Sequence, residues 1–285
     1  MEVTSQLKWH PLLSDPSSTR TGKPRMLGKT MVIDKGLGIH ALEDLLQTAG
    51  DHLDMLKMGF GTSPLYQTDL LKRKIAMAKS HQIVVYPGGT FLEVAIQQGQ
   101  VDAFFDMIGY LGFNGIEVSD GTIQIDRSLR NELIDRACES GYTVITEYGK
   151  KCWGSSIEIE ALIETVITDS EMGASLITIE GRESGKGVGI YDENGDCKDD
   201  AIEQVLQQVP SKHALLWEAP HKDQQVHLLN MLGTDINLGN IAPHEVISLE
   251  ALRRGLRSDT MQFGFQHGQE QADDEASDVV GAAAD

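Results

Sequence analysis

The stretch L-I-T-I-E-G-R-E-S-G, residues 176–185, carries the pattern that decides the fold. A short apolar, β-branched run ends in a glutamate, and glycine and further charged residues follow at once. Apolar runs that are followed by charged residues or glycine recur at 30–36, 53–63, 83–90, 115–121, 143–151, 214–222 and 235–240. Each run has the length and composition of a buried strand, so the sequence predicts eight strands.

Helical patterns lie between these runs. Residues 69–80 repeat apolar side chains near helical spacing, and 128–141 begins at Ser128 as N-cap and ends at Gly141 as the glycine after the helix. Residues 243–256 have a proline in the first turn and basic residues at the end. Strands that alternate with helices form a parallel sheet, and eight of them predict a single (β/α)₈ TIM barrel. A doubly wound open sheet is the alternative if one strand prediction fails.

The barrel is predicted over residues 26–262, between an N-terminal extension, 1–25, and an acidic disordered tail, 263–285. A formal net charge of −19 argues against nucleic acid and anionic membranes as partners, because the field of the protein repels polyanions. Apolar runs are too short to span a membrane, the N-terminus lacks the pattern of a signal peptide, and three widely spaced cysteines form no disulfide framework. We therefore expect a cytoplasmic protein, and we favour a homo-oligomer over a monomer.

Charged residues gather at the ends of the predicted strands, where the active sites of such barrels lie. Strands four to seven each carry a glutamate within or just after the apolar run: Glu117, Glu147, Glu180 and Glu218. For any single residue, a structural ion pair is as good an explanation as a function. A whole group of buried ionisable side chains is costly unless the members pair or bind a metal or ligand, so together they indicate a site.

The residue types narrow the chemistry of that site. Several carboxylates without the His and Cys spacing of zinc sites suit a hard divalent cation such as Mg²⁺. Lysines and an arginine suit phosphate or carboxylate groups. The glycines of G-R-E-S-G-K-G-V-G, 181–189, fit neither the Rossmann nor the Walker A spacing. The residues alone thus predict a metal-assisted enzyme that acts on a small phosphorylated acid.

Several longer motifs can then be considered together. They are K-M-G-F-G-T-S (57–63), V-Y-P-G-G-T-F-L-E (85–93), I-E-V-S-D-G (116–121), G-K-K (149–151), I-E-G-R-E-S-G-K-G (179–187), W-E-A-P-H-K-D-Q-Q (217–225) and N-L-G-N-I (237–241). With them the chain closely resembles the phosphosulfolactate synthase family, from about Lys23 to Thr260. The resemblance implies a (β/α)₈ barrel that adds sulfite to phosphoenolpyruvate with Mg²⁺, giving (2R)-O-phospho-3-sulfolactate. In methanogens this reaction begins coenzyme M biosynthesis.

The resemblance also implies a role for Lys151, the second lysine of G-K-K, as the general acid that protonates C2 of the substrate. We expect neighbouring cations to lower its pKa toward neutrality. The candidates for substrate binding are Lys57, Gly88, Gly89, Thr90, Arg182, Lys186, Lys222 and Asn240. The candidates for the metal, chosen by strand position, are Glu117, Glu147 and Glu180, with Asp34 or Asp120 as replacements. Whether Glu180 or Glu183 faces the site is left open.

Two other functions compete with this one. The first is an enzyme that adds another nucleophile to a phosphoenolpyruvate-like acid, and the second is a non-catalytic, stress-related homologue. The presence of Lys151 and the charged loop after Glu180 argues against the second, because a protein without catalysis has no physical reason to gather so much charge in one cleft. In one place the chain departs from the family: C-W-G-S-S, 152–156, stands where members often carry an acidic loop with proline.

Overall fold

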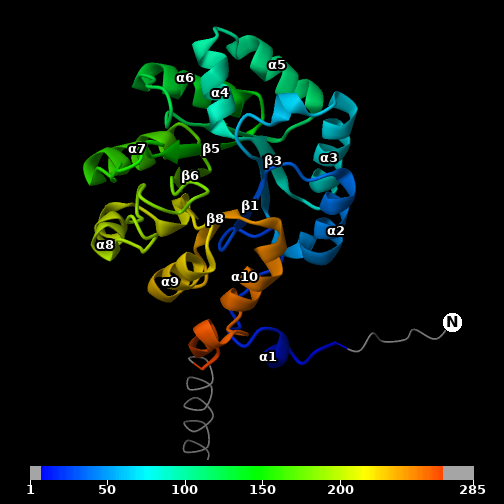
Figure 1. Ribbon diagram of the computed structural model, residues 1–285, viewed down its shortest axis with the longest axis vertical. Helices are drawn as coiled ribbons and strands as arrows, with labels where there is room; N and C mark the ends of the chain where they lie inside the picture. Colours follow the sequence, from blue (N-terminus) through cyan, green and yellow to red (C-terminus); the bar gives the residue numbers. More distant parts are fainter. Residues whose placement is uncertain (1–7, 266–285) are drawn as a thin grey trace, which may run out of the picture.

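Eight parallel strands form one nearly closed barrel inside a ring of helices in the computed structural model, which describes residues 8–265 (Figure 1). The predicted TIM barrel is therefore confirmed. The strands are β1 (Thr30–Asp34), β2 (Met55–Met58), β3 (Val84–Pro87), β4 (Gly115–Val118), β5 (Thr143–Tyr148), β6 (Leu176–Ile179), β7 (Leu215–Glu218) and β8 (Asn237–Ile241). The helices are α1 (Pro11–Ser14), α2 (Ile39–Ala49), α3 (Thr68–Ser80), α4 (Gly89–Gln97), α5 (Val101–Leu111), α6 (Arg127–Glu139), α7 (Ile159–Glu171), α8 (Asp199–Gln208), α9 (Lys222–Leu232) and α10 (Val246–Arg253).

The hydrogen-bonded ladder runs in the order β3-β2-β1-β8-β7-β6-β5-β4. Between its two ends the side chain of Asn114 closes the barrel. Asn114 Oδ1 accepts from the amide of Val85 at 2.7 Å, and Asn114 Nδ2 donates to the carbonyl of Ile83 at 3.3 Å. Glycine at position 115 permits this close approach, since a Cβ there would lie 2.7 Å from Val84 Cγ1. We call this junction of β3 and β4 the Asn114 seam.

The helix ends agree with the sequence in part. Gly141 has the expected left-handed backbone, with φ of +79°, just after α6. The expected N-cap at Ser128 is wrong by two residues: Asp126 caps α6, and its carboxylate accepts from the amide of Leu129 at 2.8 Å. Either side chain is a good cap, so propensity alone could not choose between them. Residues Pro243–Glu245 form a 3₁₀ turn, and the α-helix starts only at Val246.

The inner face of the barrel consists of an apolar layer below a charged layer. The apolar layer is formed by Met31, Met55, Tyr86, Ile145, Leu176 and Leu216. Two residues further along β2, β5 and β7, the alternation of a strand again directs side chains inward, and these are Lys57, Glu147 and Glu218. The fold therefore places ionisable groups together at the carboxyl ends of the strands.

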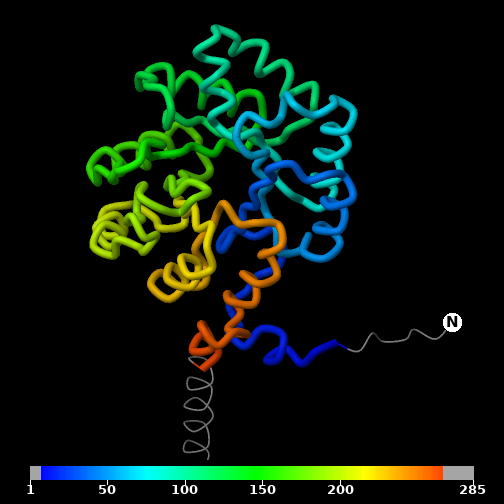
Figure 2. Tube along the Cα trace, in the orientation of Figure 1, coloured from blue at the N-terminus to red at the C-terminus, as the bar shows by residue number. Residues whose placement is uncertain are grey.

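The segment before β1 lies against the opposite end of the barrel. Arg20 forms a buried ion pair with Glu250 of α10 at 2.9 Å, and Lys23 Nζ donates to the carbonyls of Gly50, Leu53 and His81. Figure 2 shows this N-terminal segment beside the last helices of the described chain. The predicted acidic tail lies outside the described residues from Gln266 onward. Among the described residues, no helix is long and apolar enough to cross a membrane.

Candidate active site

A charged cavity of about 110 Å³ opens at the carboxyl ends of the strands. Its volume suits a small molecule rather than a large ligand. Most of the residues predicted for the site line it, together with three that were not among the predicted site residues, Ile33, Phe60 and Glu218. The predicted residues in its wall are Lys57, Gly88, Gly89, Thr90, Glu117, Glu147, Lys151, Glu180, Arg182 and Asn240. Glu183 also lines it.

Lys57 is the centre of the charged layer. Its Nζ lies 2.9 Å from Glu117 Oε1, 3.3 Å from Glu147 Oε2 and 3.4 Å from Glu218 Oε1. Burial opposes the charge of this ammonium group, but the three carboxylates outweigh burial and raise the pKa of Lys57 well above its ordinary value. Lys57 thus holds glutamates from three strands together.

Lys151, the predicted general acid, lies beside this centre. Its Nζ is 2.7 Å from Glu147 Oε1, 3.5 Å from Glu180 Oε2 and 3.2 Å from Thr90 Oγ1. Burial opposes its charge, yet Glu147 and Glu180 raise the pKa of Lys151 above its ordinary value. The expected lowering by nearby cations is therefore wrong, because the nearest charged groups are carboxylates. Lys151 carries its proton in this arrangement, as a general acid must before it reacts.

The glutamates differ in their protonation. Burial raises the pKa of Glu117, and burial together with the charges of Glu147 and Glu218 raises the pKa of Glu180 well above its ordinary value. Burial also opposes ionisation of Glu147, but Lys151 and Lys57 lower the pKa of Glu147 to about 2. If the four buried glutamates and two lysines were all ionised, the cluster would have two negative charges in excess. A divalent cation would balance this excess.

The turn after β6 shows which of the two glutamates of that loop, Glu180 or Glu183, faces the cavity. Glu180 is buried in the cavity wall, and its Oε1 accepts from the amide of Arg182 at 2.7 Å. Glu183 lies at the mouth, half exposed, and pairs with Lys35 at 3.0 Å. Both therefore line the cavity, Glu180 inside and Glu183 at the rim.

The predicted glycine turn after β3 becomes the start of α4. The amide of Gly89 donates to Glu117 Oε2 at 2.6 Å, so a carboxylate from β4 occupies this position at the helix N-terminus. A Cβ at position 89 would lie 2.4 Å from Ser119 Oγ, which leaves room only for glycine. Both oxygens of Glu117 thus have partners: the amide of Gly89 and the ammonium of Lys57.

The unusual segment 152–156 packs on the loop that follows β6. The amide of Gly154 donates to the carbonyl of Gly187 at 2.8 Å, and the amide of Gly189 donates to the carbonyl of Ser155 at 3.1 Å. A Cβ at Gly187, whose φ is +64°, would lie 2.8 Å from the ring of Trp153. The tryptophan of this segment therefore covers a glycine of the charged loop that follows β6.

Not every predicted residue joins the cavity wall. Lys222 turns to Asp259, with Nζ 3.0 Å from Oδ2, and Lys186 is exposed next to Gly195. Asn240 does line the cavity, with φ of +56° and a buried Oδ1 that has no hydrogen-bond partner among the described residues. The two alternative metal ligands have other partners: Asp34 pairs with Lys74, and Asp120 with Arg130 and Lys150.

The three predicted metal ligands meet the chemical needs of Mg²⁺ only in part. They supply hard oxygen donors and the excess negative charge. Within residues 8–265, however, no three His, Cys, Asp or Glu side chains are arranged to hold a metal ion, because the ammonium groups of Lys57 and Lys151 lie between the carboxylates. Mg²⁺ commonly takes one or two protein carboxylates and completes its shell with water and substrate oxygens, and this site can meet that smaller requirement.

The molecule is a TIM barrel with a small charged cavity at the carboxyl ends of its strands, the position of the active site in such barrels. The sequence profile of the (2R)-phospho-3-sulfolactate synthase (ComA) family matches residues 18–259, and the chain belongs to this family. It is 43% identical over 235 residues to the phosphosulfolactate synthase of Methanocaldococcus jannaschii, covering 82% of this chain and 93% of that protein. It is 41% identical over 244 residues to the phosphosulfolactate synthase of Methanothermobacter thermautotrophicus, covering 85% and 94%. Among solved structures, the YdjI aldolase of Escherichia coli K12 shares the fold, with a TM-score of 0.52, 12% identity and 84% of each chain covered.

Proposed function

We propose that this chain is a phosphosulfolactate synthase that adds sulfite to C3 of phosphoenolpyruvate and yields (2R)-O-phospho-3-sulfolactate, a carbon–sulfur bond-forming lyase. Lys151 carries the proposal: a protonated lysine, 24% exposed, lies in the wall of a small charged cavity in a member of the family. A cytoplasmic location and a homo-oligomeric state remain predictions.

In the proposed reaction, the sulfur lone pair of sulfite attacks C3 and forms the C–S bond. The electron pair of the C2–C3 double bond moves to C2 and the attached carboxylate, and a proton from Lys151 Nζ then completes C2. The phosphate ester at C2 stays intact. Positioning Lys151 on one face of the substrate would give a single configuration at C2. A general acid placed in this way typically contributes about 10²–10⁴ in rate.

Two anions must be brought together in this reaction, so the chain has to offset their repulsion. Arg182 and Lys151 are the partly exposed cations of the cavity wall, and Lys57 lies below them. The side-chain amide of Asn240 is a neutral group whose oxygen has no partner among the described residues. This oxygen can accept a hydrogen bond from a protonated oxygen of the ligand or from an ordered water, and the amide nitrogen can donate to a ligand oxygen. These groups suit a substrate of three carbons with a phosphate and a carboxylate.

Mg²⁺ would be held by Glu147 and Glu180 in preference to Glu117. Each of these two keeps one oxygen in a longer contact with a lysine, at 3.3 and 3.5 Å, whereas both oxygens of Glu117 have partners within 2.9 Å. When bound, the ion would stabilise negative charge that develops on the substrate carboxylate. Glu147 has a second role without the metal, since it holds the ammonium of Lys151 at 2.7 Å and thereby fixes the proton donor.

The decisive experiment incubates the purified protein with ¹³C-labelled phosphoenolpyruvate, sulfite and Mg²⁺ and follows the carbons by NMR. We expect C3 to change from an alkene carbon to a carbon bonded to sulfonate, and C2 to gain one proton. Replacing sulfite by sulfate, which has no sulfur lone pair, is the control and should leave the substrate unchanged. A folded protein that forms no C3 sulfonate with any divalent cation would contradict the proposal.

A further inference from the structure

Arg182 has a backbone conformation that needs support. Its φ is +56°, in the left-handed region that a residue with a side chain rarely adopts. The guanidinium nonetheless lines the cavity, where Nη1 donates to the carbonyl of Lys151 at 3.0 Å. If residue 182 relaxed to the ordinary negative φ, its side chain would leave in another direction. The position of the Arg182 guanidinium in the cavity therefore depends on the contacts that hold this turn.

Glu218, at the end of β7, makes two of the contacts that hold it, and Glu180 Oε1 accepts from the Arg182 amide as a third, at 2.7 Å. Glu218 Oε2 accepts from the amides of both Gly181 and Arg182, at 3.0 and 3.1 Å. Its Oε1 lies 3.4 Å from Lys57 Nζ, so the same carboxylate also joins the charged centre. Two adjacent amides directed at one ionised oxygen form strong, charge-assisted hydrogen bonds.

The main chain of Glu218 is fixed as firmly as its side chain. Tyr191 Oη donates to the carbonyl of Glu218 at 2.6 Å, and both residues are buried. Gly181 packs directly on this strand end: a Cβ there would lie 2.7 Å from the Glu218 carbonyl oxygen and 2.8 Å from Tyr191 Cε2. The turn thus rests on a rigid support, and Glu218 has little freedom to follow the loop if the loop moves.

We propose that Glu218 is a positioning residue that holds Arg182 in its left-handed turn and so sets the place where an anionic group of the substrate binds. The inference rests on the proposed function for the identity of that substrate, phosphoenolpyruvate. Glu218 contacts the cation through the backbone of the loop and shares the ammonium of Lys57 with Glu117 and Glu147. Glu180 also accepts from the Arg182 amide, but it contacts Lys151 directly, as Glu147 does, whereas Glu218 alone of these three accepts from the amide of Gly181.

The first test is a double-mutant cycle on phosphoenolpyruvate binding, measured by calorimetry with Mg²⁺ present. Glu218→Ala should weaken binding about tenfold in the native background and less than about twofold in Arg182→Ala, because the turn then has no guanidinium to place. Glu218→Gln keeps an acceptor oxygen for both amides and should bind within about threefold of the native protein. Equal losses in both backgrounds, or a glutamine variant as weak as the alanine variant, would overturn the inference.

The second test needs no substrate. Hydrogen exchange of the Gly181 amide should be at least about tenfold faster in Glu218→Ala than in the native protein, and close to native in Glu218→Gln. If the alanine variant does not fold, Glu218→Asp takes its place, since it keeps the charge near Lys57 but is one methylene too short for the turn. Unchanged exchange in a folded variant would overturn the inference. A native protein that does not bind phosphoenolpyruvate while Gly181 behaves as expected would instead contradict the proposed function.

Discussion

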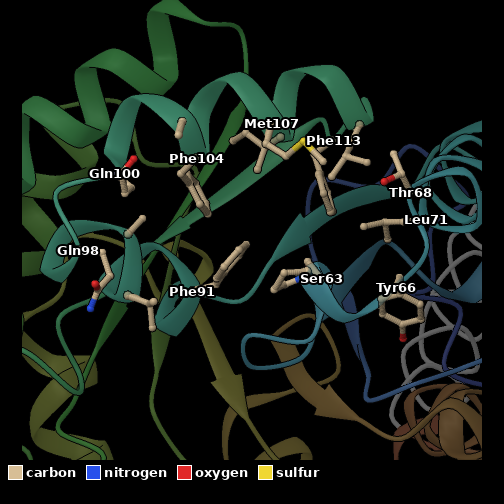
Figure 3. A pocket seen from close by; sticks show the side chains of 16 residues that line it. Ser63, Tyr66, Thr68, Leu71, Phe91, Gln98, Gln100, Phe104, Met107 and Phe113 are labelled. Atoms are coloured by element: carbon tan, nitrogen blue, oxygen red, sulfur yellow. The ribbon is translucent and has the colours of Figure 1, made fainter.

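Two cavities lie along α4, and they differ in volume and in the chemistry of the residues that line them. The charged cavity is at the N-terminus of the helix, where Gly89 meets Glu117. The second, an apolar cavity of about 400 Å³, lies between α4, α5 and the segment around Ser63 (Figure 3). There the rings of Phe91 and Phe104 face each other edge to face, with centroids 5.4 Å apart.

The comparison teaches that chemistry, and not volume, marks the site in this protein. The apolar cavity is the larger of the two, yet none of the residues that line it is Asp, Glu, Lys, Arg or His. It therefore offers no charged side chain to stabilise charge that develops in a reaction. The small charged cavity can stabilise such charge and transfer a proton, because opposite charges are held there at distances of about 3 Å in a water-poor setting.

The largest effect that we expect is a loss of stability when the charged cavity loses its central lysine. Lys57→Met should lower the free energy of unfolding by about 3–5 kcal/mol, because three buried carboxylates lose their cation. Urea denaturation at neutral pH measures this loss. Lys35→Met, at an exposed pair, should change stability by less than about 1 kcal/mol. A Lys57→Met variant as stable as the native protein would mean that the charged layer is not held together by this lysine.

The next effect concerns turnover. Lys151→Ala should lower turnover by about 10² or more while phosphoenolpyruvate still binds, because the proton donor is lost and most anion contacts remain. Steady-state kinetics and calorimetry measure the two quantities. The matched control is the neighbouring Lys150→Ala, which removes a half-exposed lysine paired with Asp120 and should retain most of the activity. Similar losses in both variants would leave no special role for Lys151.

A change in the apolar cavity should give the opposite result. Phe104→Leu should lower the free energy of unfolding by about 1 kcal/mol, because an aromatic pair and some buried area are lost. Turnover should stay within about twofold of the native value. Met107→Leu, at a partly exposed position of the same wall, is the control with a smaller effect. If Phe104→Leu lowered turnover tenfold in a folded protein, α4 would couple the two cavities and the contrast between them would fail.

The smallest effect is a dependence on pH. Burial and neighbouring carboxylates raise the pKa of Glu180, so its stabilising contribution is complete below the ordinary carboxyl pKa of 4.5 and is lost as the pH rises through the raised value. Glutamine cannot ionise and avoids this loss. The melting temperature of Glu180→Gln relative to the native protein should therefore increase by about 2–4 °C from pH 5 to pH 9 without divalent cations. Glu183→Gln, at the exposed rim, should show a flat difference.

The sequence predicted the barrel well, because eight apolar runs that end in charge leave little choice of architecture. It also predicted most of the cavity wall, since parallel strands bring residues such as Glu147 and Glu180 to the same edge. It predicted neither the direction of the Lys151 pKa nor the partner of Lys222. Those depend on which charged group is nearest in space, and Asp259 lies 37 residues from Lys222 in the chain.

Glu218 is a residue of the cavity wall whose role the sequence did not predict. It follows the strand-end pattern of Glu117, Glu147 and Glu180, yet it was not among the predicted site residues. The sequence signal that could have identified Glu218 was its position at the end of an apolar run, which it shares with the other three glutamates. What distinguishes it is a pair of hydrogen bonds to the amides of the next loop, and backbone turns such as that of Arg182 are not visible in residue types.

Because of the Asn114 seam, the hydrogen-bonded ladder of strands begins and ends at a different place from the chain. The ladder is continuous where the first and last strands meet, at β1 and β8, and it is interrupted between β3 and β4, which are neighbours in sequence. A circularly permuted chain that began at β4 and finished at β3 would follow the ladder from one edge to the other. The new termini of such a chain could be placed at Gly99, an exposed residue between α4 and α5. The wall of the charged cavity that contains Gly88 and Glu117 would then be formed by the two outermost strands of the rearranged protein.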